Sequence, residues 1–170
     1  MYHSDLCLHK NIERYIASAA KFEFYLIFKD YRFAKTDSYG NVKGVCWDAL
    51  ASELESTKSF CEFDISRGGF AYFEDSEPKK LMLNCSHCEK PELVWSDQAD
   101  GTTVLDGWLT LLTSRLHRLR CNVAHGSKAF PPQGDYSRSE KLLVAGWALM
   151  SWIADVCWGE SNWEDTLVFY

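Results

Sequence analysis

One short segment of the chain, residues 118–128, gathers side chains that suit chemistry on a phosphodiester. It contains Arg120 and, five positions later, His125, with Asn122 between them. A guanidinium is permanently charged and its fork matches two phosphate oxygens, so it can bind a phosphate and stabilise charge that develops there. An imidazole titrates near neutral pH and can move a proton to or from a ribose hydroxyl or a leaving oxygen. Asn122 could orient either group. The same spacing is also common on ordinary surface helices.

The distribution of charge around this segment favours an anionic ligand. The chain has a net charge of −6, which excludes a protein that is basic over its whole surface, yet the 28 residues between Asp106 and Asp135 contain no acid. Arg115, Arg118 and Lys128 lie in this window, and we expect them to hold RNA phosphates. A local basic patch on an acidic protein indicates one site for an anion, whereas the alternative interpretation is a solvated helix face.

A predicted helix positions these residues. At about 100° per residue, Arg120 falls on one flank of its apolar stripe, while Arg118, Asn122 and His125 fall on the other. Arg120 and His125 therefore meet only if the helix ends at Gly126 or if a second copy of the helix contributes its own pair. The apolar stripe consists of Leu105, Leu112, Leu116, Leu119 and Val123.

The rest of the chain predicts a mainly α fold, a helical bundle of about four helices with a small β-hairpin insertion, in a single domain over residues 1–170. Apolar residues at helical spacing predict three further helices, and two short apolar runs around Pro91 predict the hairpin. We expect helices over about 9–33, 45–58 and 137–157, hairpin strands at 81–83 and 93–95, loops at 36–44 and 130–134, and a turn with a short helix or strand within 60–73.

Composition indicates a cytoplasmic globular protein. Hydrophobic residues make up 46% and charged residues 25% of the chain. No run reaches the ~18 uninterrupted apolar residues of a membrane span, and we expect no secretory signal and no membrane association. The seven cysteines are then reduced thiols. Cys85 and Cys88 have the spacing of metal ligands, but no second such pair follows, so we expect no metal and no cofactor.

Tryptophans are concentrated towards the C-terminus. They predict packing in the core or at a dimer interface. The tail after Trp158 ends in four apolar residues, so we expect it to dock on the body of the protein or on a partner chain. The tryptophans of this region are Trp108, Trp147, Trp152, Trp158 and Trp163.

The stretch from Arg118 to Lys128, with its R-x4-H motif, resembles the signature of the HEPN superfamily of helical ribonuclease-like domains from bacterial defence and toxin systems. The upstream hairpin and the Gly-x-Lys after the histidine are similar to stand-alone HEPN proteins of the Apea-like kind. The resemblance implies a metal-independent endoribonuclease that works as a homodimer, with the helix that carries the R-x4-H motif at the interface between the two copies. It would leave 2′,3′-cyclic phosphate and 5′-hydroxyl ends, with Arg120 and His125 at the two defining motif positions.

Two departures from the HEPN pattern matter. Cys121 follows the motif arginine, where family members usually have a polar residue, and this keeps open a non-catalytic module that binds RNA or a protein. A purely structural dimerisation domain is the third interpretation. Ser127 stands where members with a nucleotidyltransferase antitoxin carry tyrosine, which makes that partner less expected, although another antitoxin or defence-system partner stays open.

Overall fold

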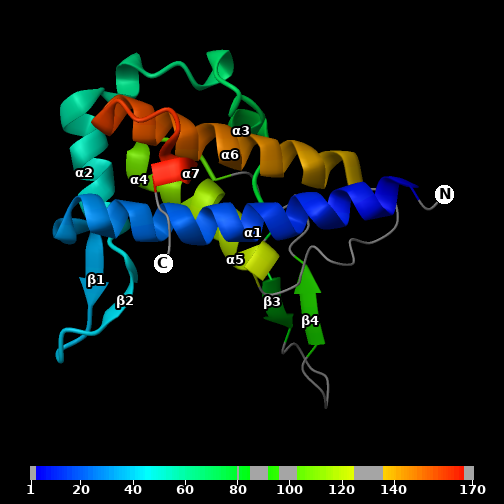
Figure 1. The fold of residues 1–170 in the computed structure, drawn as a ribbon. Coiled ribbons are helices and arrows are strands. Elements are labelled where there is room, and N and C mark those ends of the chain that lie inside the picture. The colour runs from blue at the N-terminus through cyan, green and yellow to red at the C-terminus, as the bar shows by residue number, and fades with distance from the viewer. Residues whose placement is uncertain (1–2, 80, 85–91, 96–102, 125–135, 167–170) are drawn as a thin grey trace.

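Two long helices, α1 (His3–Lys29) and α6 (Tyr136–Trp158), lie side by side along the molecule (Figure 1). The computed structural model describes residues 3–79, 81–84, 92–95, 103–124 and 136–166. The fold is mainly helical, with 71% helix in four main helices, and this confirms the predicted helical bundle with a small hairpin. The remaining main helices are α2 (Trp47–Thr57) and a composite helix, here called the motif helix, formed by α4 (Trp108–Leu111), η5 (Leu112–His117) and α5 (Arg118–Ala124).

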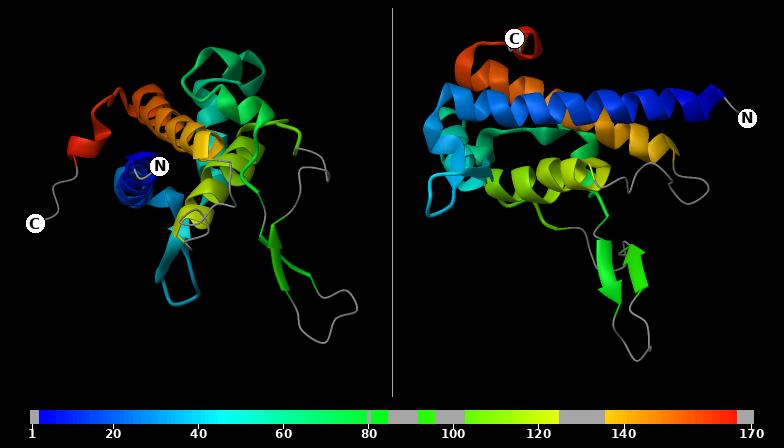
Figure 2. Two further views of the ribbon diagram at one scale, coloured as in Figure 1. Left: turned by 90° about the vertical axis from the view of Figure 1, so that its right-hand side faces the viewer. Right: turned by 60° about the horizontal axis from the view of Figure 1, so that its bottom comes forward.

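Short elements connect the main helices. They are the 3-10 turns η1 (Tyr31–Phe33), η2 (Phe60–Glu62) and η3 (Ile65–Arg67), the short helices α3 (Tyr72–Asp75) and α7 (Trp163–Thr166), and two antiparallel hairpins, β1 (Ala34–Thr36) with β2 (Val42–Val45) and β3 (Leu81–Asn84) with β4 (Glu92–Trp95). Both hairpins project from the same side of the bundle (Figures 1 and 2).

The hairpin formed by β3 and β4 is the predicted one, with Leu81 opposite Trp95. The hairpin formed by β1 and β2 was not predicted, because the sequence favours a loop over residues 36–44. Its turn does follow that loop signature: the Asp37 carboxylate accepts hydrogen bonds from the backbone N–H of Tyr39 and of Asn41, each at 2.9 Å. The strands β1 and β2 are about as short as β3 and β4, but they lack the run of consecutive apolar residues that predicted the other hairpin.

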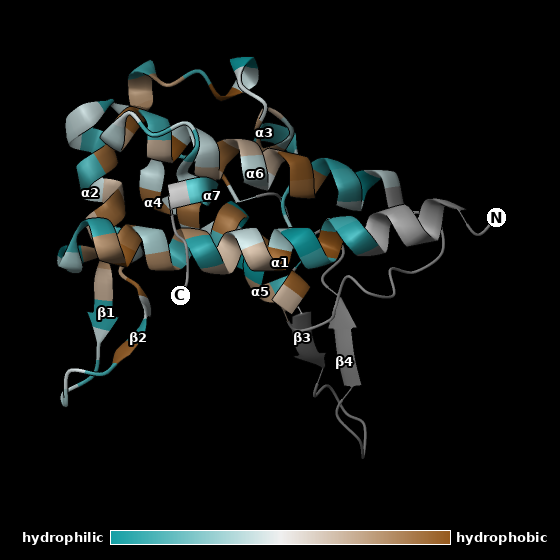
Figure 3. Ribbon diagram, viewed as in Figure 1, coloured by the Kyte–Doolittle hydropathy of each residue, from teal (hydrophilic) through white to brown (hydrophobic). Residues whose placement is uncertain are grey.

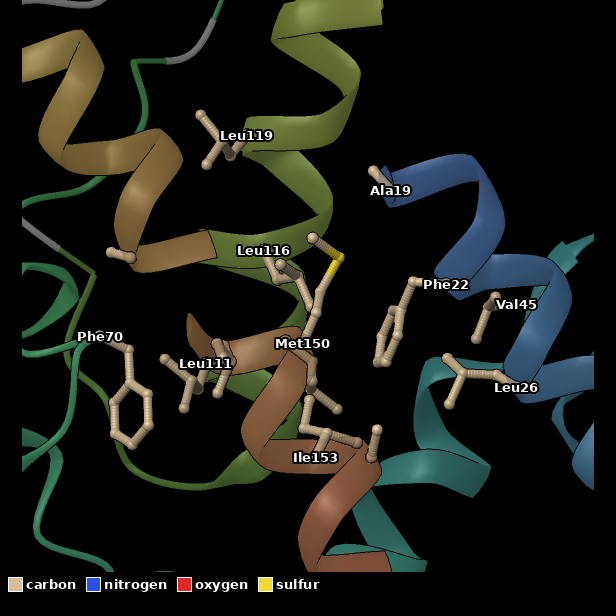
Figure 4. Close-up of a cluster of buried hydrophobic side chains, with 14 of the residues drawn as sticks. Ala19, Phe22, Leu26, Val45, Phe70, Leu111, Leu116, Leu119, Met150 and Ile153 are labelled. Carbon is tan, nitrogen blue, oxygen red and sulfur yellow. The ribbon is translucent and has the colours of Figure 1, made fainter. Parts of the chain in front are cut away.

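Side chains from α1, the motif helix and α6 form the hydrophobic core. In Figure 4, Phe22 and Leu26 of α1 face Met150 and Ile153 of α6, and Leu116 of the motif helix lies beside Met150 on its other side. All five are at most 3% exposed. The stripe predicted on the motif helix is therefore its buried face from Leu112 onwards.

Helix α6 is the most apolar long helix. Its segment Ser137–Trp158 is long enough to cross a bilayer and contains an 18-residue window with a mean hydropathy of 1.3. Figure 3 shows hydrophilic residues near its N-terminal end and hydrophobic residues along its middle. Leu142, Leu149 and Ile153 are completely buried, so packing against α1, α2, α3 and the motif helix accounts for this composition.

Aromatic residues make up a large share of the remaining core, as predicted for the tryptophans. Trp108 and Trp152 stack with ring centroids 5.3 Å apart. The segment after α6 turns back along α1, where Trp163 of α7 is 1% exposed and packs edge-on against Phe22 at 5.2 Å. This confirms docking on the body for the tail up to α7, while residues 167–170 lie outside the described residues.

Candidate functional site

The motif helix changes its hydrogen-bonding pattern halfway along. Residues Leu112–His117 form a π turn, and the N–H of Arg118 donates to the carbonyl of Thr113, five residues earlier. A wider turn of this kind rotates the residues that follow it relative to an ideal α-helix. Within α5 the predicted arrangement holds: Arg120 points towards α1, whereas Arg118 and Asn122 point towards the segment that leads into β3.

On the inner side of the motif helix, Arg115 is completely buried. Its Nε donates to the carbonyl of Phe73 at 2.9 Å, its Nη2 to the carbonyl of Thr103 at 2.9 Å, and its Nη1 to Ser114 Oγ at 3.0 Å. Burial also lowers the pKa of this guanidinium. Arg115 is thus a structural residue, and the prediction that it holds RNA phosphates has no support in this geometry because its donors are used within the protein.

Glu77 joins Arg115 to Arg118. Its Oε2 lies 3.4 Å from Arg115 Nη1, and its Oε1 forms an ion pair with Arg118. Both carboxylate oxygens also accept hydrogen bonds from Thr103, at 2.7 and 2.8 Å. Arg115, Arg118, Glu77 and Thr103 are called the inner cluster below. Arg118 is 22% exposed in its side chain, so most of its surface is also covered.

Asn122 has a structural partner as well. Its side chain is 7% exposed, and Nδ2 donates to the carbonyl of Lys79 at 2.8 Å. This bond fixes the end of the motif helix to the segment just before β3. The amide is therefore directed away from Arg120, and the predicted role of Asn122 in orienting the catalytic groups has no support in this geometry.

On the outer side, Arg120 forms a two-pronged contact with Glu23 of α1. Arg120 Nε lies 3.0 Å from Glu23 Oε1, and Nη2 donates to Oε2 at 3.2 Å. The side chains are 36% and 19% exposed, so this outer pair lies at the surface, unlike Arg115. Burial raises the pKa of Glu23, and the charge of Arg120 only partly offsets that effect. Water therefore solvates the Glu23 carboxylate poorly.

Beside the outer pair lie His117 and Cys121, with the thiol Sγ 3.5 Å from His117 Nε2. Burial lowers the pKa of His117, and the positive charges of Arg120 and Lys35 lower it further. The imidazole is therefore neutral at pH 7. Lys35 belongs to β1 and is exposed, so it adds a cation to this part of the surface.

Several predicted residues lie outside the described residues. These are His125, Gly126, Ser127 and Lys128, together with Cys85 and Cys88. Within the described ranges, no group of three His, Cys, Asp or Glu side chains is close enough to hold a metal ion.

Three residues of this region were missed by sequence reasoning: Glu23, Glu77 and Lys35. Glu23 had a signal, because it is an acid flanked on both sides by phenylalanine, and a charge in such an apolar segment needs a partner. Glu77 lies 38 residues before Arg115 without a regular spacing to it, and Lys35 comes from the unpredicted hairpin. Neither position could be found from periodicity.

No family model, no curated protein and no solved structure matches the chain. Function is therefore inferred from the residues themselves. Of the three described arginines predicted to contact RNA, Arg120 has the most exposed side chain. Its fork already holds an anionic group with two oxygens, which is the geometry by which a guanidinium binds a phosphate.

Proposed function

We propose that this protein is a metal-independent endoribonuclease of the HEPN type. It cleaves RNA to 2′,3′-cyclic phosphate and 5′-hydroxyl ends, and acts in the cytoplasm of a bacterium as part of a defence or toxin system. The observation that carries this proposal is the two-pronged, half-exposed guanidinium of Arg120 near the end of the motif helix, five residues before His125. The HEPN resemblance of residues 118–128 and the helical bundle add to it.

In the proposed reaction, Arg120 binds the scissile phosphate. Its fork donates to the two non-bridging oxygens and stabilises the negative charge that grows on them as the 2′-hydroxyl attacks phosphorus. The new 2′-O–P bond forms, and the P–O5′ bond breaks. His125 accepts the proton that the 2′-hydroxyl loses and, as the imidazolium, donates it to the leaving 5′-oxygen, so that the proton count balances. Residues of the chain supply every group in this scheme.

The surface near Arg120 provides further contacts to the RNA backbone. The positive charges of Lys35 and of Arg120 both lower the pKa of His117, so the two cations act on the same histidine. We include Lys35 and Lys128 as phosphate contacts and leave out Arg115, whose donors are used in the core. Arg118 is retained only as a support of the inner cluster. Each phosphate that a lysine neutralises makes binding more sensitive to salt.

A second candidate is a non-catalytic module that binds RNA or a protein partner. The specific observation in its favour is Glu23, which occupies the fork of Arg120 at 3.0 and 3.2 Å. A guanidinium that is already paired with a carboxylate of the same chain has a structural role in the protein without RNA. RNA would then have to displace Glu23, and Cys121 would replace the polar residue usual after the motif arginine.

Incubation of the purified protein with single-stranded and structured RNA in EDTA tests the proposal. We expect cleavage with cyclic-phosphate ends, and a loss of about 10²–10⁴-fold in rate for His125→Ala, which is the usual contribution of a general acid or base. Arg120→Ala should lose cleavage to a similar extent because charge on the phosphate is no longer stabilised.

The matched control is Arg14→Ala, which removes an arginine that packs over the ring of Trp147 instead. This variant should cleave at the rate of the wild type. Binding of RNA by wild type and His125→Ala without any cleavage would favour the binding module. Cleavage that His125→Ala retains would exclude the proposed mechanism.

A further inference from the structure

A pocket lies between α6 and the segment that joins α2 to α3, and it is called the loop pocket below. Its described lining residues come from positions 58–70 and from Ala148 and Trp152 of α6, and its volume is about 500 Å³. Small-molecule sites commonly have volumes of about 300–1,000 Å³. In Figure 1 the joining segment lies above α6, on the side of the bundle away from the two hairpins. The loop pocket is therefore a different surface from that of the outer pair.

Aromatic rings form the floor of the loop pocket. The ring centroid of Phe63 lies 4.8 Å from that of Trp152 and 5.2 Å from that of Phe70. Phe70 is buried, whereas Phe63 and Trp152 are only half-buried, and all three line the pocket. Pairs of aromatic rings attract each other beyond the gain from buried area alone. The floor therefore favours a ligand with a flat aromatic group.

Two glycines hold the wall of the pocket against this floor. A Cβ atom on Gly68 would lie 2.2 Å from Cζ of Phe70, and one on Gly69 would lie 2.8 Å from Cβ of Ala148. Any larger residue at either position would force the segment away from the ring or from α6. The wall is thus fixed by close backbone packing, and the pocket exists before a ligand enters it.

Four charged side chains line the loop pocket, and their charges cancel. Arg67 and Asp64 pair with each other, with Arg67 Nε 2.7 Å from Asp64 Oδ2. The other two are Lys58 and Glu62. Within the part of the chain that the structure describes, neither the Lys58 ammonium nor the Glu62 carboxylate has a polar partner. One cation and one anion therefore remain available to a ligand.

The 3-10 turn η2 brings these two free charges to one pocket. Lys58 precedes the turn and Glu62 is its last residue. The backbone is held at both positions: the carbonyl of Lys58 accepts from Nε1 of Trp108 at 2.9 Å, and the N–H of Glu62 donates to the carbonyl of Ser59 at 3.0 Å. An α-amino acid carries its ammonium and its carboxylate on one carbon atom, so a site for it needs opposite charges that converge in this way.

We infer that the loop pocket binds an amino acid with an aromatic side chain. Lys58 pairs with its carboxylate, Glu62 pairs with its ammonium, and its ring lies on Phe63 and Trp152. Charge complementarity selects this class of ligand. A purely anionic ligand would face the carboxylate of Glu62, and a purely cationic one would face the ammonium of Lys58, and each such pair of like charges costs affinity. The inference does not rest on the proposed ribonuclease function.

Isothermal titration calorimetry of the full chain tests this inference with four probes. They are L-phenylalanine, phenethylamine, which lacks the carboxylate, phenylpropionate, which lacks the ammonium, and glycine, which lacks the ring. We expect phenylalanine to bind and each of the other three to bind at least about ten-fold more weakly, because each loses one of the three contacts. Failure of phenylalanine to bind, or equal binding of any other probe, would overturn the inference.

Two variants show whether the binding occurs in the loop pocket. Lys58→Met should weaken the binding of phenylalanine about ten-fold but not that of phenethylamine, which has no carboxylate to lose. Glu62→Gln should weaken the binding of phenylalanine to a similar extent but not that of phenylpropionate. Both side chains lie at the surface, so circular dichroism should show unchanged helical content.

The matched controls are Lys10→Met and Glu140→Gln, which remove the same charges from exposed positions of α1 and α6. Both should bind phenylalanine as the wild type does. Unchanged affinity in Lys58→Met and Glu62→Gln, or an equal loss in the variants and their controls, would place the binding elsewhere and contradict the inference. A loss in Lys58→Met that is the same for phenylalanine and phenethylamine would also contradict it, because the pairing of Lys58 with the carboxylate would then have no effect.

Discussion

The two sides of the motif helix use the same residue types, arginine and glutamate, in opposite surroundings. In the inner cluster, Arg115 is completely buried and donates to two backbone carbonyls and to Ser114. In the outer pair, Arg120 keeps 36% of its side chain exposed, and within the described part of the chain its guanidinium donates to Glu23 alone. The difference lies in what else each guanidinium contacts.

This difference separates a structural arginine from one that can exchange its partner. The carbonyls of Phe73 and Thr103 cannot leave Arg115 without opening the fold. The Glu23 carboxylate can be displaced from Arg120 more easily, because this pair lies at the surface, where water and ions compete for the guanidinium. Residue type alone therefore does not distinguish the two arginines of this helix, whereas the nature of their partners does.

Arg115→Ala gives the largest effect expected from this comparison. Removing the guanidinium leaves the carboxylate of Glu77 without its buried partner and two carbonyls without donors, which should lower the free energy of unfolding by about 3–5 kcal/mol. Arg120→Ala should cost about 1 kcal/mol or less, because a half-exposed ion pair contributes little. Urea denaturation followed by circular dichroism measures both. Equal losses in the two variants would remove the distinction between the inner cluster and the outer pair.

The second-largest effect is expected for Glu23→Gln, and it is a change in RNA affinity. The amide holds the Arg120 fork less strongly than the carboxylate does, so RNA should bind about ten-fold more tightly at neutral pH. The gain should shrink as the pH falls, because burial raises the pKa of Glu23 and the wild-type carboxyl then takes up its own proton. Affinity is measured by fluorescence anisotropy with a labelled RNA across this pH range.

Glu13→Gln is the control for that measurement. It removes one negative charge from an exposed position of the same helix, ten residues from Glu23. A similar gain in affinity for both variants would mean that net charge, and not the fork of Arg120, sets RNA binding.

The fold was predictable from the sequence where apolar residues keep the helical spacing over several turns. The helical stripes of α1, α2, the motif helix and α6 extend over several turns, and the predicted bundle is confirmed. The hairpin of β1 and β2 was not predicted, because its strands lack the run of apolar residues that indicated β3 and β4. The end of α1 was placed near residue 33, whereas the helix stops at Lys29 and Asp30 caps the turn η1 by accepting the N–H of Arg32 at 2.8 Å.

The candidate site was predictable on one element only. Angles around the motif helix placed Arg120 apart from Arg118 and Asn122, as found. Their partners Glu23, Glu77 and Lys79 come from 97, 41 and 43 residues away in sequence, and only the tertiary fold decides such pairs. For the same reason, the sequence could not distinguish the buried Arg115 from an exposed cation.

Lys35→Gln should give the smallest change in RNA affinity, and it tests how far the proposed RNA-binding surface extends from Arg120. If Lys35 neutralises one RNA phosphate, its loss should weaken binding about three-fold and reduce the slope of log affinity against log salt by about 1. Lys43→Gln on the same hairpin is the matched control, because Lys43 is paired with Asp37 at 3.1 Å and should leave the slope unchanged. Equal changes in both variants would show that the hairpin acts through its net charge, which would limit the RNA-binding surface to the outer pair itself.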